Sequence, residues 1–419
     1  MRIVRESMPD ERVAFGGGKV SSGCVEPGSC LGCRLCVNIC PETALVFLEP
    51  DTMKVHAEKC IFCEICAEVC PMKILSIKGD EKMLEWKIFV PERRHKMKFF
   101  GNLEAEVISK GICSHCTACA SICPVNGITA GDKPISFPEY IKYCVDCGAC
   151  IRVCPRWDYK PKSGIGNYIE AFAGRSKRFS GQDGAMVTEV IATAFEIGAI
   201  NAAVLVSRDE DWNTKVVTVT SVEQLKNEKL RGSKYSFADV MPAVKDAVLR
   251  YNSIAFVGTP CMITALRKMQ ENFKKFERVK LAIGIFCTEN FYYHDLSKFL
   301  LEKKKVDIRN ALKTNISKGK FIVNLKSGEV VSFSVKELDE IVPSGCKVCQ
   351  DFSAVDSDIS FGSSGSPDGF STVIVRSEFA KKITDTIKER GSAELGQVNI
   401  EAVKKSCEYK VKIHPYSTK

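Results

Sequence analysis

One cysteine pattern constrains this chain more than any other feature. The spacing Cys-x2-Cys-x2-Cys-x3-Cys-Pro occurs four times before residue 156, as two pairs. Thiolate is the soft ligand that iron-sulfur clusters require, and gaps of two residues let one tight loop hold three corners of a cube. The pattern therefore predicts two small ferredoxin-type domains with two 4Fe-4S clusters each. The first pair is Cys30, Cys33, Cys36, Cys40 and Cys60, Cys63, Cys66, Cys70; the second is Cys113, Cys116, Cys119, Cys123 and Cys144, Cys147, Cys150, Cys154.

The fourth cysteine of each motif is expected to serve the neighbouring cluster. In two-cluster ferredoxins the last cysteine of one motif binds the cluster of the other motif, which cross-links the two halves of the domain. Applied to this chain, the rule predicts four ligand sets. They are Cys30, Cys33, Cys36 with Cys70; Cys60, Cys63, Cys66 with Cys40; Cys113, Cys116, Cys119 with Cys154; and Cys144, Cys147, Cys150 with Cys123.

Other uses for these cysteines fit the sequence less well. Residues 1–19 have no apolar core that would mark a signal peptide, so we do not expect a secreted disulfide scaffold. Structural zinc sites use two separated cysteine pairs rather than three closely spaced cysteines and a fourth before proline. We expect Cys24 and Cys407, which lie outside the motifs, to bind no metal, and His115, inside a motif loop, to be an exposed side chain.

The rest of the sequence divides by composition. Residues 80–110 are rich in Lys, Glu and Met, contain no cysteine and predict a helical connector. Beyond residue 164, strand-like and helix-like runs alternate, as in an α/β domain. The predicted boundaries are a tail at 1–21, ferredoxin domains at 22–79 and 111–160, the connector between them and a C-terminal domain at 161–419. Within that domain we expect helices at 185–197 and 261–269, strands at 202–207 and 254–257, and a hairpin of 321–325 with 330–335.

Four cysteines of the C-terminal domain stand in marked contexts. Cys261 and Cys287 are single, and Cys346 forms a Cys-x2-Cys pair with Cys349. Together they could supply four soft ligands, so their chemistry favours a fifth cube; a zinc site and merely buried cysteines are the alternatives. Cys261 is expected at a helix N-terminus, where the helix dipole and free amides would lower its thiol pKa.

Five short phrases of the C-terminal domain occur in an order that resembles one known family. They are Gly181-Gln182-Asp183-Gly184, Gly232-Ser233-Lys234-Tyr235, Gly258-Thr259-Pro260-Cys261, Phe286-Cys287-Thr288-Glu289-Asn290 and Gly365-Ser366-Pro367-Asp368-Gly369. Over about residues 165–385 the chain is similar to the beta subunits of coenzyme F420-reducing hydrogenases and dehydrogenases. Each phrase alone is weak, but the combination is specific.

The resemblance implies a domain that binds FAD, carries one cube beside the flavin and exchanges hydride with coenzyme F420. In agreement, no Gly-x-Gly-x-x-Gly fingerprint follows a predicted strand. The implied ligands of the fifth cube are Cys261, Cys287, Cys346 and Cys349. The implied flavin-site residues are Asp183, Gly184, Gly232, Ser233, Lys234, Thr259, Pro260, Asn290, Gly365, Ser366 and Thr372. A surface role for Lys234, and a plain turn in place of a flavin loop at residues 364–372, are the alternatives.

Together these parts predict an α+β chain: two ferredoxin-like domains followed by a mixed α/β flavoprotein domain without a Rossmann fingerprint. Hydride carries two electrons whereas a cube accepts one, so a flavin has to join them. We therefore expect an F420 oxidoreductase subunit that relays electrons through five cubes to a redox partner protein or larger complex, and we predict no catalytic acid, base or nucleophile. The alternatives are a polyferredoxin-type electron hub without its own turnover and a related flavoprotein that uses another donor.

The charge balance adds no nucleic-acid partner. The formal charge is +9, but a cube with four thiolates carries about 2−, so five cubes would bring the total to about −1. The apolar stretch 190–206 contains Glu196 and Asn201 and is too short to span a bilayer. We expect a soluble, cytoplasmic protein without membrane insertion, and leave peripheral membrane association open.

Overall fold

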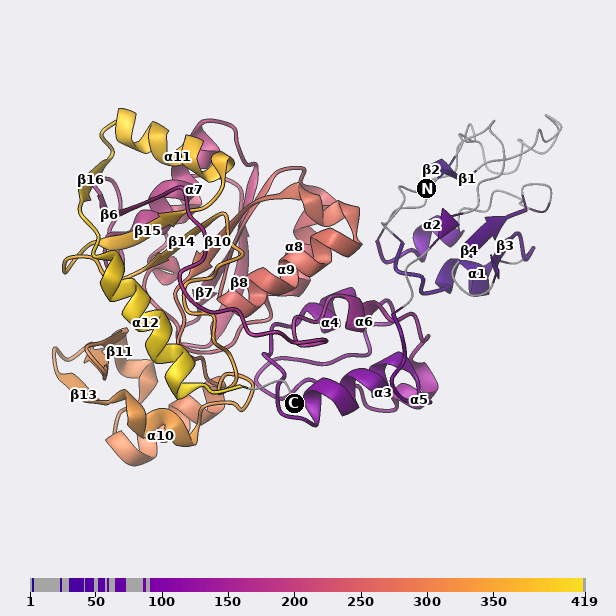
Figure 1. Ribbon diagram of the computed structural model, residues 1–419, viewed down its shortest axis with the longest axis horizontal. Helices are drawn as coiled ribbons and strands as arrows, with labels where there is room; N and C mark the ends of the chain where they lie inside the picture. The colour runs from indigo at the N-terminus through magenta and orange to yellow at the C-terminus, as the bar shows by residue number, and fades with distance from the viewer. Residues whose placement is uncertain are drawn as a thin grey trace.

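The computed structural model describes residues 2–3, 23–24, 30–40, 42–48, 52–56, 59, 65–72, 86–87 and 91–416. Figure 1 shows three bodies side by side: a large domain that carries β6 to β16, a helical unit with α3 to α6, and a smaller N-terminal unit with α1, α2, β3 and β4. The mixed architecture agrees with the predicted fold class. No helix of the described ranges is both long and apolar enough to cross a membrane.

An eight-stranded mixed sheet forms the centre of the large domain, in the order β16-β6-β15-β14-β10-β9-β7-β8. The four inner strands β14, β10, β9 and β7 are mutually parallel and almost wholly apolar, as expected where helices cover both faces of a sheet. The outer strands run antiparallel to their neighbours. The bounds are β6 (Glu170–Ser176), β7 (Ala202–Arg208), β8 (Thr214–Val219), β9 (Ile254–Gly258), β10 (Val279–Ile285), β14 (Ile359–Gly362), β15 (Ser371–Val375) and β16 (Ala393–Gly396).

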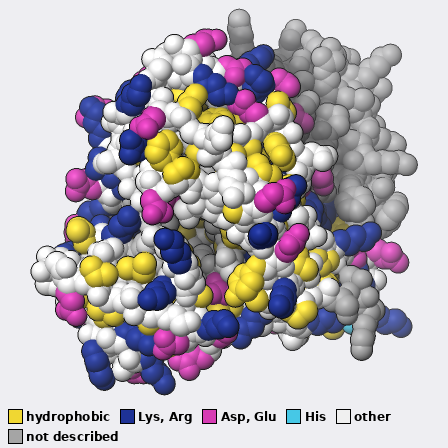
Figure 2. All heavy atoms as spheres, turned by 60° about the vertical axis from the view of Figure 1, so that its left-hand side comes forward, with side chains coloured by type: hydrophobic (Ala, Val, Ile, Leu, Met, Phe, Trp, Pro, Cys, Tyr) yellow, Lys and Arg dark blue, Asp and Glu magenta, His cyan; other side chains and the backbone are white. Residues whose placement is uncertain are grey.

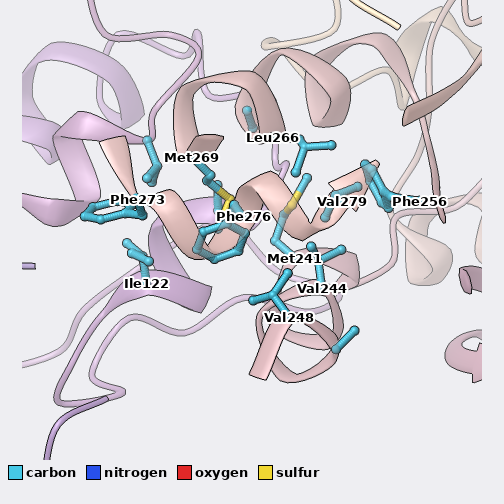
Figure 3. Packing of buried hydrophobic residues seen from close by; sticks show 14 of the residues in the cluster. Ile122, Met241, Val244, Val248, Phe256, Leu266, Met269, Phe273, Phe276 and Val279 are labelled. Atoms are coloured by element: carbon cyan, nitrogen blue, oxygen red, sulfur yellow. The ribbon is translucent and has the colours of Figure 1, made fainter. Parts of the chain in front are cut away.

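Helices cover the two faces of this sheet in pairs. Alternate residues of β7 divide between two cores: Ala203 and Leu205 join the core of α7 and α11, whereas Ala202 and Val204 join that of α8 and α9. Figure 3 shows the second core, with Met241 and Val244 beside Leu266 and Met269. The helices and strands predicted between residues 185 and 269 are confirmed. The helix bounds are α7 (Met186–Glu196), α8 (Val240–Arg250), α9 (Pro260–Asn272) and α11 (Glu378–Glu389).

A small three-stranded sheet is inserted after β10. The predicted hairpin is present as β12 (Lys320–Leu325) and β13 (Val330–Ser334), and β11 (Ala311–Ser317), which the sequence did not reveal, pairs antiparallel with β12. Phe299 of α10 (Tyr293–Lys304) packs with Phe321 and Phe333 in the core of this insert. The C-terminal helix α12 (Ile400–Ile413) returns to the main sheet, where Val403 and Cys407 pack against Ile374.

The helical unit contains the second pair of cysteine motifs. Its helices are α3 (Phe99–Leu103), continued by one π-type turn, η3 (Glu104–Ile108), and α4 (Ala118–Ile122), α5 (Tyr140–Tyr143) and α6 (Ala149–Arg152). The α3–η3 helix lies within the stretch predicted as a connector, and its apolar side chains join the cysteines in the core of this second module. Helices α4 and α6 pack against α8 and α9, and Ile122 meets the helices of the large domain in Figure 3.

The N-terminal unit holds the first pair of motifs. Its described elements are β1 (Arg2–Ile3), paired with β2 (Gly23–Cys24), then α1 (Leu35–Ile39), α2 (Ile65–Glu68) and a meander of β3 (Leu45–Leu48), β4 (Thr52–Val55) and β5 (Trp86–Lys87). Met72 and Leu31 join the core that α8 and α9 share with the second module. The carbonyl of Met72 accepts a hydrogen bond from Lys275 Nζ at 3.1 Å. The two modules and the large domain are therefore packed together.

Candidate functional site

Three cysteine loops share one backbone conformation. The second residue after the first cysteine and the residue after the second cysteine have positive φ in each loop. Left-handed residues on either side of a cysteine can turn successive backbone amides toward one side of a tight loop, and such concave loops bind anions. In agreement, the amides of Gly32 and Asp146 donate to the Sγ atoms of Cys30 and Cys144 at 3.3 and 3.4 Å. The left-handed residues are Gly32 and Arg34, His115 and Thr117, and Asp146 and Gly148.

The second module gathers its eight motif cysteines into two groups. Burial raises the pKa of Cys119 well above its usual range, and the nearby thiols of Cys113, Cys116 and Cys154 raise it further. Burial likewise raises the pKa of Cys150, with Cys147, Cys144 and Cys123 adding to the rise. The neighbours of each of these two thiols thus include the fourth cysteine of the other motif, as the predicted ligand sets require. Cys123, Cys144, Cys147 and Cys150 also line one pocket together with Phe99, Phe100 and Phe137.

The first module shows one comparable group. Burial raises the pKa of Cys36, and the thiols of Cys30, Cys33 and Cys70 raise it further. Cys40 accepts a hydrogen bond at Sγ from the amide of Ala44 at 3.3 Å. Cys60 and Cys63 lie outside the described residues, so the set that they would form with Cys66 and Cys40 stays a prediction.

A fifth group of thiols lies in the large domain. Cys261 is in the first turn of α9, Cys287 follows β10, and Cys346 and Cys349 come after the inserted sheet. Burial raises the pKa of Cys287 well above its usual range; Lys410 opposes this rise, and Cys346, Cys261 and Cys349 add to it. The structure therefore brings together four cysteines that the chain separates by up to 88 residues (from 261 to 349).

Two basic groups, Lys410 and Arg156, act on the thiols of this fifth group. Although burial acts in the opposite direction, Lys410 and Arg156 lower the pKa of the Cys349 thiol. Lys410 is fully buried on α12, and its Nζ donates to the carbonyls of Cys287 and Asp351 at 2.5 and 2.7 Å. The expectation for Cys261 was wrong: burial and the nearby Cys349 raise its pKa despite its place at a helix N-terminus. Loss of hydration here outweighs the helix dipole.

The side chains around these groups fit an anionic cluster better than a single ion. Among the described residues, no three Cys, His, Asp or Glu side chains converge on one metal-ion position. A 4Fe-4S cube does not need that convergence, because each thiolate binds a different iron atom. The described cysteines are free thiols. Thr117 Oγ1 and the Nε and Nη1 atoms of Arg156 are buried without hydrogen-bond partners, as donors that face a missing acceptor would be.

The cysteine groups follow one another across the domain boundaries. Burial raises the pKa of Cys33 to about 12, and Cys147 of the second module contributes to the rise. Burial raises the pKa of Cys116, and among the nearby thiols Cys261 of the large domain adds most to the rise. Cys261 Sγ also lies 3.9 Å from the carbonyl oxygen of Ser114. The second module therefore stands between the first module and the fifth group.

His115 is not exposed as expected. Its side chain is 2% exposed, its Nε2 is hydrogen-bonded to the carbonyl of Gly131 at 2.7 Å, and its ring lies 4.7 and 5.2 Å from the rings of Phe237 and Tyr292. Burial lowers the pKa of His115 and favours a neutral ring. This histidine joins the second module to the large domain, a role that depends on tertiary packing and has no local sequence signal.

Two of the phrases expected at the flavin meet on strand β11. The side-chain amide of Gln182 donates to the carbonyl of Thr314 at 3.1 Å, and Thr314 Oγ1 donates to the carbonyl of Ser233 at 3.1 Å. Lys313 Nζ donates to the carbonyl of Gln182 at 3.0 Å. Residues 181–184 and 232–235 are thereby held side by side. Gly232 has a φ of 78°, which glycine adopts without strain.

Asp183 links these phrases to the loop at residues 364–369. Burial raises the pKa of Asp183, Lys313 lowers it, and Asp368 of that loop raises it. The three groups therefore lie near one another. Gly365 also belongs to the loop and has a φ of 87°, and Ser366 Oγ is hydrogen-bonded to the carbonyls of Ser363 and Phe370 at 3.0 and 2.9 Å.

Other predicted flavin residues have contacts within the protein. Lys234 Nζ donates to the carbonyl of Leu230 at 2.7 Å, and burial, with Arg208, lowers its pKa to about 7. Thr372 is fully buried and donates to the carbonyl of Ser364 at 2.7 Å. A β-carbon at Gly184 would lie 2.0 Å from the carbonyl oxygen of Gly174, so glycine is required there for packing.

The last three predicted flavin residues, Thr259, Pro260 and Asn290, lie beside the fifth thiol group. Thr259 precedes Pro260 at the start of α9, and its Oγ1 is 3.3 Å from Cys261 Sγ. The carbonyl of Asn290 accepts from Cys346 Sγ at 3.8 Å, and its Oδ1 is buried without a partner. Sequence reasoning missed Lys313, Arg156 and Lys410 because each acts on residues far away in the chain. Of the site residues that were not predicted, only Gln182 had a signal in the sequence, because it belongs to the phrase that contains Asp183.

Four family models match the chain. Residues 169–245 match the N-terminal model, and residues 251–401 the C-terminal model, of the beta subunit of coenzyme F420 hydrogenase/dehydrogenase. Residues 29–74 and 112–159 each match a 4Fe-4S dicluster domain. The matches therefore cover both cysteine modules and most of the large domain.

Curated relatives and a solved structure agree with these models. A subunit of the F(420)H(2) dehydrogenase of Methanosarcina mazei is 36% identical over 298 residues, which cover 68% of this chain and 85% of that protein. The coenzyme F420-dependent sulfite reductase of Methanocaldococcus jannaschii is 34% identical over 73% of this chain, but the match spans only 50% of that protein. A chain of the F420-reducing NiFe hydrogenase complex from Methanosarcina barkeri superposes with a TM-score of 0.57 at 26% identity, over 61% of this chain and 92% of that one. The chain belongs to the family of coenzyme F420 hydrogenase/dehydrogenase beta subunits, with two 4Fe-4S dicluster domains at its N-terminal side.

Proposed function

We propose that this chain is an F420 oxidoreductase subunit that exchanges hydride between coenzyme F420 and FAD and relays single electrons through five 4Fe-4S clusters. The proposed ligands are the twenty cysteines of the four motifs and of the fifth group. The family and the dicluster domains support iron-sulfur electron transfer with a link to coenzyme F420. FAD, the number of cubes and the ligand sets are parts of the proposal.

The position of the fifth thiol group is the observation that carries this proposal. On one side Cys261 is close to Cys113 and Cys116 of the second module. On the other side is Tyr235, whose pKa burial raises to about 12 and on which both Asp183 and Cys287 act. Tyr235, which ends the phrase 232–235 expected at the flavin, thus lies near both Asp183 and Cys287 of the fifth group. A carrier bound at Asp183 would face the start of a chain of thiol groups.

The residues of this region suit an anionic cofactor. When bound, FAD would exchange hydride with coenzyme F420 and single electrons with a cube. Lys313 supplies positive charge beside Gln182, and Lys234 would gain full positive charge on pairing with an anionic group. The amide of Ile316 donates to the hydroxyl of Tyr235 at 2.9 Å. Figure 2 shows Lys and Arg side chains, with acidic side chains among them, on the face of the molecule that it presents. Basic side chains near the cofactor site would attract the acidic groups of FAD and of a coenzyme.

The relatives support a partner of one kind. They are a component of an F(420)H(2) dehydrogenase, a sulfite reductase and hydrogenase beta subunits. We infer that this chain likewise delivers electrons to, or takes them from, a larger oxidoreductase. The free thiols of the described residues are those of a protein that works in a reducing compartment, and we place it in the cytoplasm.

Anoxic mixing with reduced coenzyme F420 and a one-electron dye tests this function. The purified protein should contain about 20 iron atoms and one FAD per chain, and it should reduce the dye. Turnover only with another donor would assign it to a related flavoprotein. Bound flavin and cubes without turnover would make it an electron hub. About 16 iron atoms would remove the fifth cube, and zinc in place of iron and sulfide would end the proposal.

A further inference from the structure

Two buried arginines lie where cysteine groups of different domains meet. Arg152 is 6% exposed and Arg156 is 3% exposed, and they are four residues apart in the second module. Burial of a guanidinium costs free energy unless nearby negative charge compensates for the lost hydration. The groups around each arginine therefore indicate which negative charges compensate for its burial.

Arg156 stands between the second module and the fifth thiol group. Its Nη2 donates to the carbonyl of Gly345 at 3.2 Å, and its guanidinium lies 4.0 Å from the ring centroid of Tyr159. Gly345 directly precedes Cys346 of the fifth group. On the side of the second module, the backbone amide of Arg156 donates to the Sγ atom of Cys154 at 3.4 Å.

Arg152 occupies the corresponding place between the second and first modules. Its Nη2 donates to the carbonyl of Leu31 at 2.8 Å, and its guanidinium lies 4.6 Å from the ring centroid of Phe273. Leu31 lies between Cys30 and Cys33 of the first module, and the same Nη2 is 3.4 Å from the carbonyl oxygen of Cys30. Arg152 itself lies between Cys150 and Cys154 of the second module.

We propose that Arg152 and Arg156 are positioning residues of the electron relay, each of which holds a fixed positive charge between two cubes of adjacent domains. This inference rests on the proposed cubes. A cube with four thiolates carries about 2− and gains one further negative charge on reduction, so two neighbouring cubes oppose each other's reduction. A guanidinium keeps its proton, and its charge acts more strongly in a protein interior than in water. It therefore favours the reduced form of both cubes.

The transfer itself needs nothing more from these residues. With cubes bound, one electron would pass from a reduced cube to its oxidised neighbour, without any change of covalent bonds or protons on the arginines. Without the cation, both cubes at a junction would be harder to reduce. The two arginines act at different junctions, so their removal should affect different cubes.

The test is an EPR-monitored redox titration of the full-length, cluster-loaded protein with dithionite and mediators, which requires no coenzyme F420. In Arg156→Gln and in Arg152→Gln, two cubes each should become about tenfold harder to reduce, which is about 59 mV for a one-electron couple. The two variants should shift different pairs of cubes. Arg156→Lys, which keeps the charge, should recover most of the shift.

Arg94→Gln is the matched control. Arg94 belongs to the same module, but its side chain is 40% exposed and pairs with Glu106 and Asp158, so its replacement should leave all potentials unchanged. Unshifted potentials in both Gln variants at full iron content would overturn the proposal, and so would an equal shift in Arg94→Gln.

Assembly of the cubes provides the second readout. If Arg152→Gln or Arg156→Gln lacks cubes, Arg152→Met or Arg156→Met is titrated in its place. If neither the Gln nor the Met substitution of Arg156 assembles its cubes but Arg156→Lys does, assembly itself needs the positive charge, and the proposal stands. If Arg156→Lys also fails to assemble its cubes, the shape of the side chain is what matters, and the proposal fails. Iron content and EPR of the unmodified protein are measured first, and an absence of cubes there would refute the proposed function instead.

Discussion

Gly345 touches Cys113 so closely that a β-carbon on Gly345 would lie 1.8 Å from the Cys113 carbonyl oxygen and 3.2 Å from the Ser114 amide nitrogen. This contact joins the segment that leads into the fifth thiol group to the first cysteine loop of the second module. Real atoms cannot approach so closely, so any larger residue at position 345 would push the two domains apart.

Gly345→Ala should therefore weaken the junction between the fifth group and the second module. Overpacking of this kind costs about 1–3 kcal/mol, which a thermal melt of the loaded protein would show. Reduction of bound flavin by reduced coenzyme F420 should remain fast, while passage of electrons to a dye should slow. Gly396→Ala is the control, because its β-carbon would meet Ala173 and Phe370 only at 3.7 Å. Equal behaviour of the two variants would contradict the contact.

Cysteine replacement separates proposed ligands from a buried bystander. Cys287→Ser should lose one cube, so that iron falls from about 20 to about 16 atoms per chain. Cys407→Ser should keep its iron, because Cys407 is fully buried on α12 among apolar side chains. Iron and sulfide analysis with EPR spectroscopy measures both. Loss of four iron atoms from Cys407→Ser, or none from Cys287→Ser, would show that the assignment of the fifth group is wrong.

Flavin binding should depend on pH through Lys234. Burial, with Arg208, lowers the pKa of Lys234 to about 7. Pairing with the FAD diphosphate would raise that pKa, so binding would take up a proton and FAD affinity would fall as the pH rises from about 7. Lys234→Met should bind FAD about tenfold more weakly at pH 7 and lose the pH dependence, because a charge-assisted hydrogen bond contributes about 1.5–3 kcal/mol. Fluorescence titration of deflavinated protein measures the affinity.

The pH dependence of protein stability that Lys234 causes has the opposite sign to that of FAD affinity. Between a folded pKa of about 7 and an unfolded pKa of about 10.4, the unfolded state binds more protons, so this group makes the flavin-free protein more stable as the pH rises through that window. Lys229→Met provides a control, since Lys229 is 40% exposed and pairs with Glu210. A pH profile of FAD binding that is unchanged in Lys234→Met would exclude Lys234 as a diphosphate partner.

Gly184→Ala should lower stability rather than flavin affinity alone. The new β-carbon would lie 2.0 Å from the Gly174 carbonyl oxygen and 2.7 Å from the Ser371 amide nitrogen, where β6 and β15 pair. We expect a loss of about 1–3 kcal/mol and a lower melting temperature of the apoprotein. Asp183→Asn, next in sequence and only partly buried, should keep the melting temperature and weaken FAD binding. If both variants melt like the unmodified protein, Gly184 is not required for packing.

The cysteine loops could be predicted from the sequence because their geometry is local. Residues such as His115, Thr117 and Asp146 adopt left-handed conformations within seven-residue loops, and the spacing of the cysteines reports that shape directly. The helix at 186–196 and strand β9 were also predictable, since their apolar periodicity and flanking glycines lie within each segment. Strand β11 lacked such a signal, because it is half polar and gains its place by pairing with β12.

The sequence by itself determined which atoms this protein offers to its cofactors: thiolates at fixed spacings, and short glycine-rich phrases in a fixed order. Only the tertiary structure decided which of these groups are neighbours, because packing between segments far apart in the chain brings Cys33 near Cys147, Cys116 near Cys261, and Arg156 near Cys349. Burial decided the charges as well, since it made His115 a neutral link between domains and raised the pKa of Cys261. Loss of hydration depends on what covers a group, and no local pattern in the sequence specifies that cover.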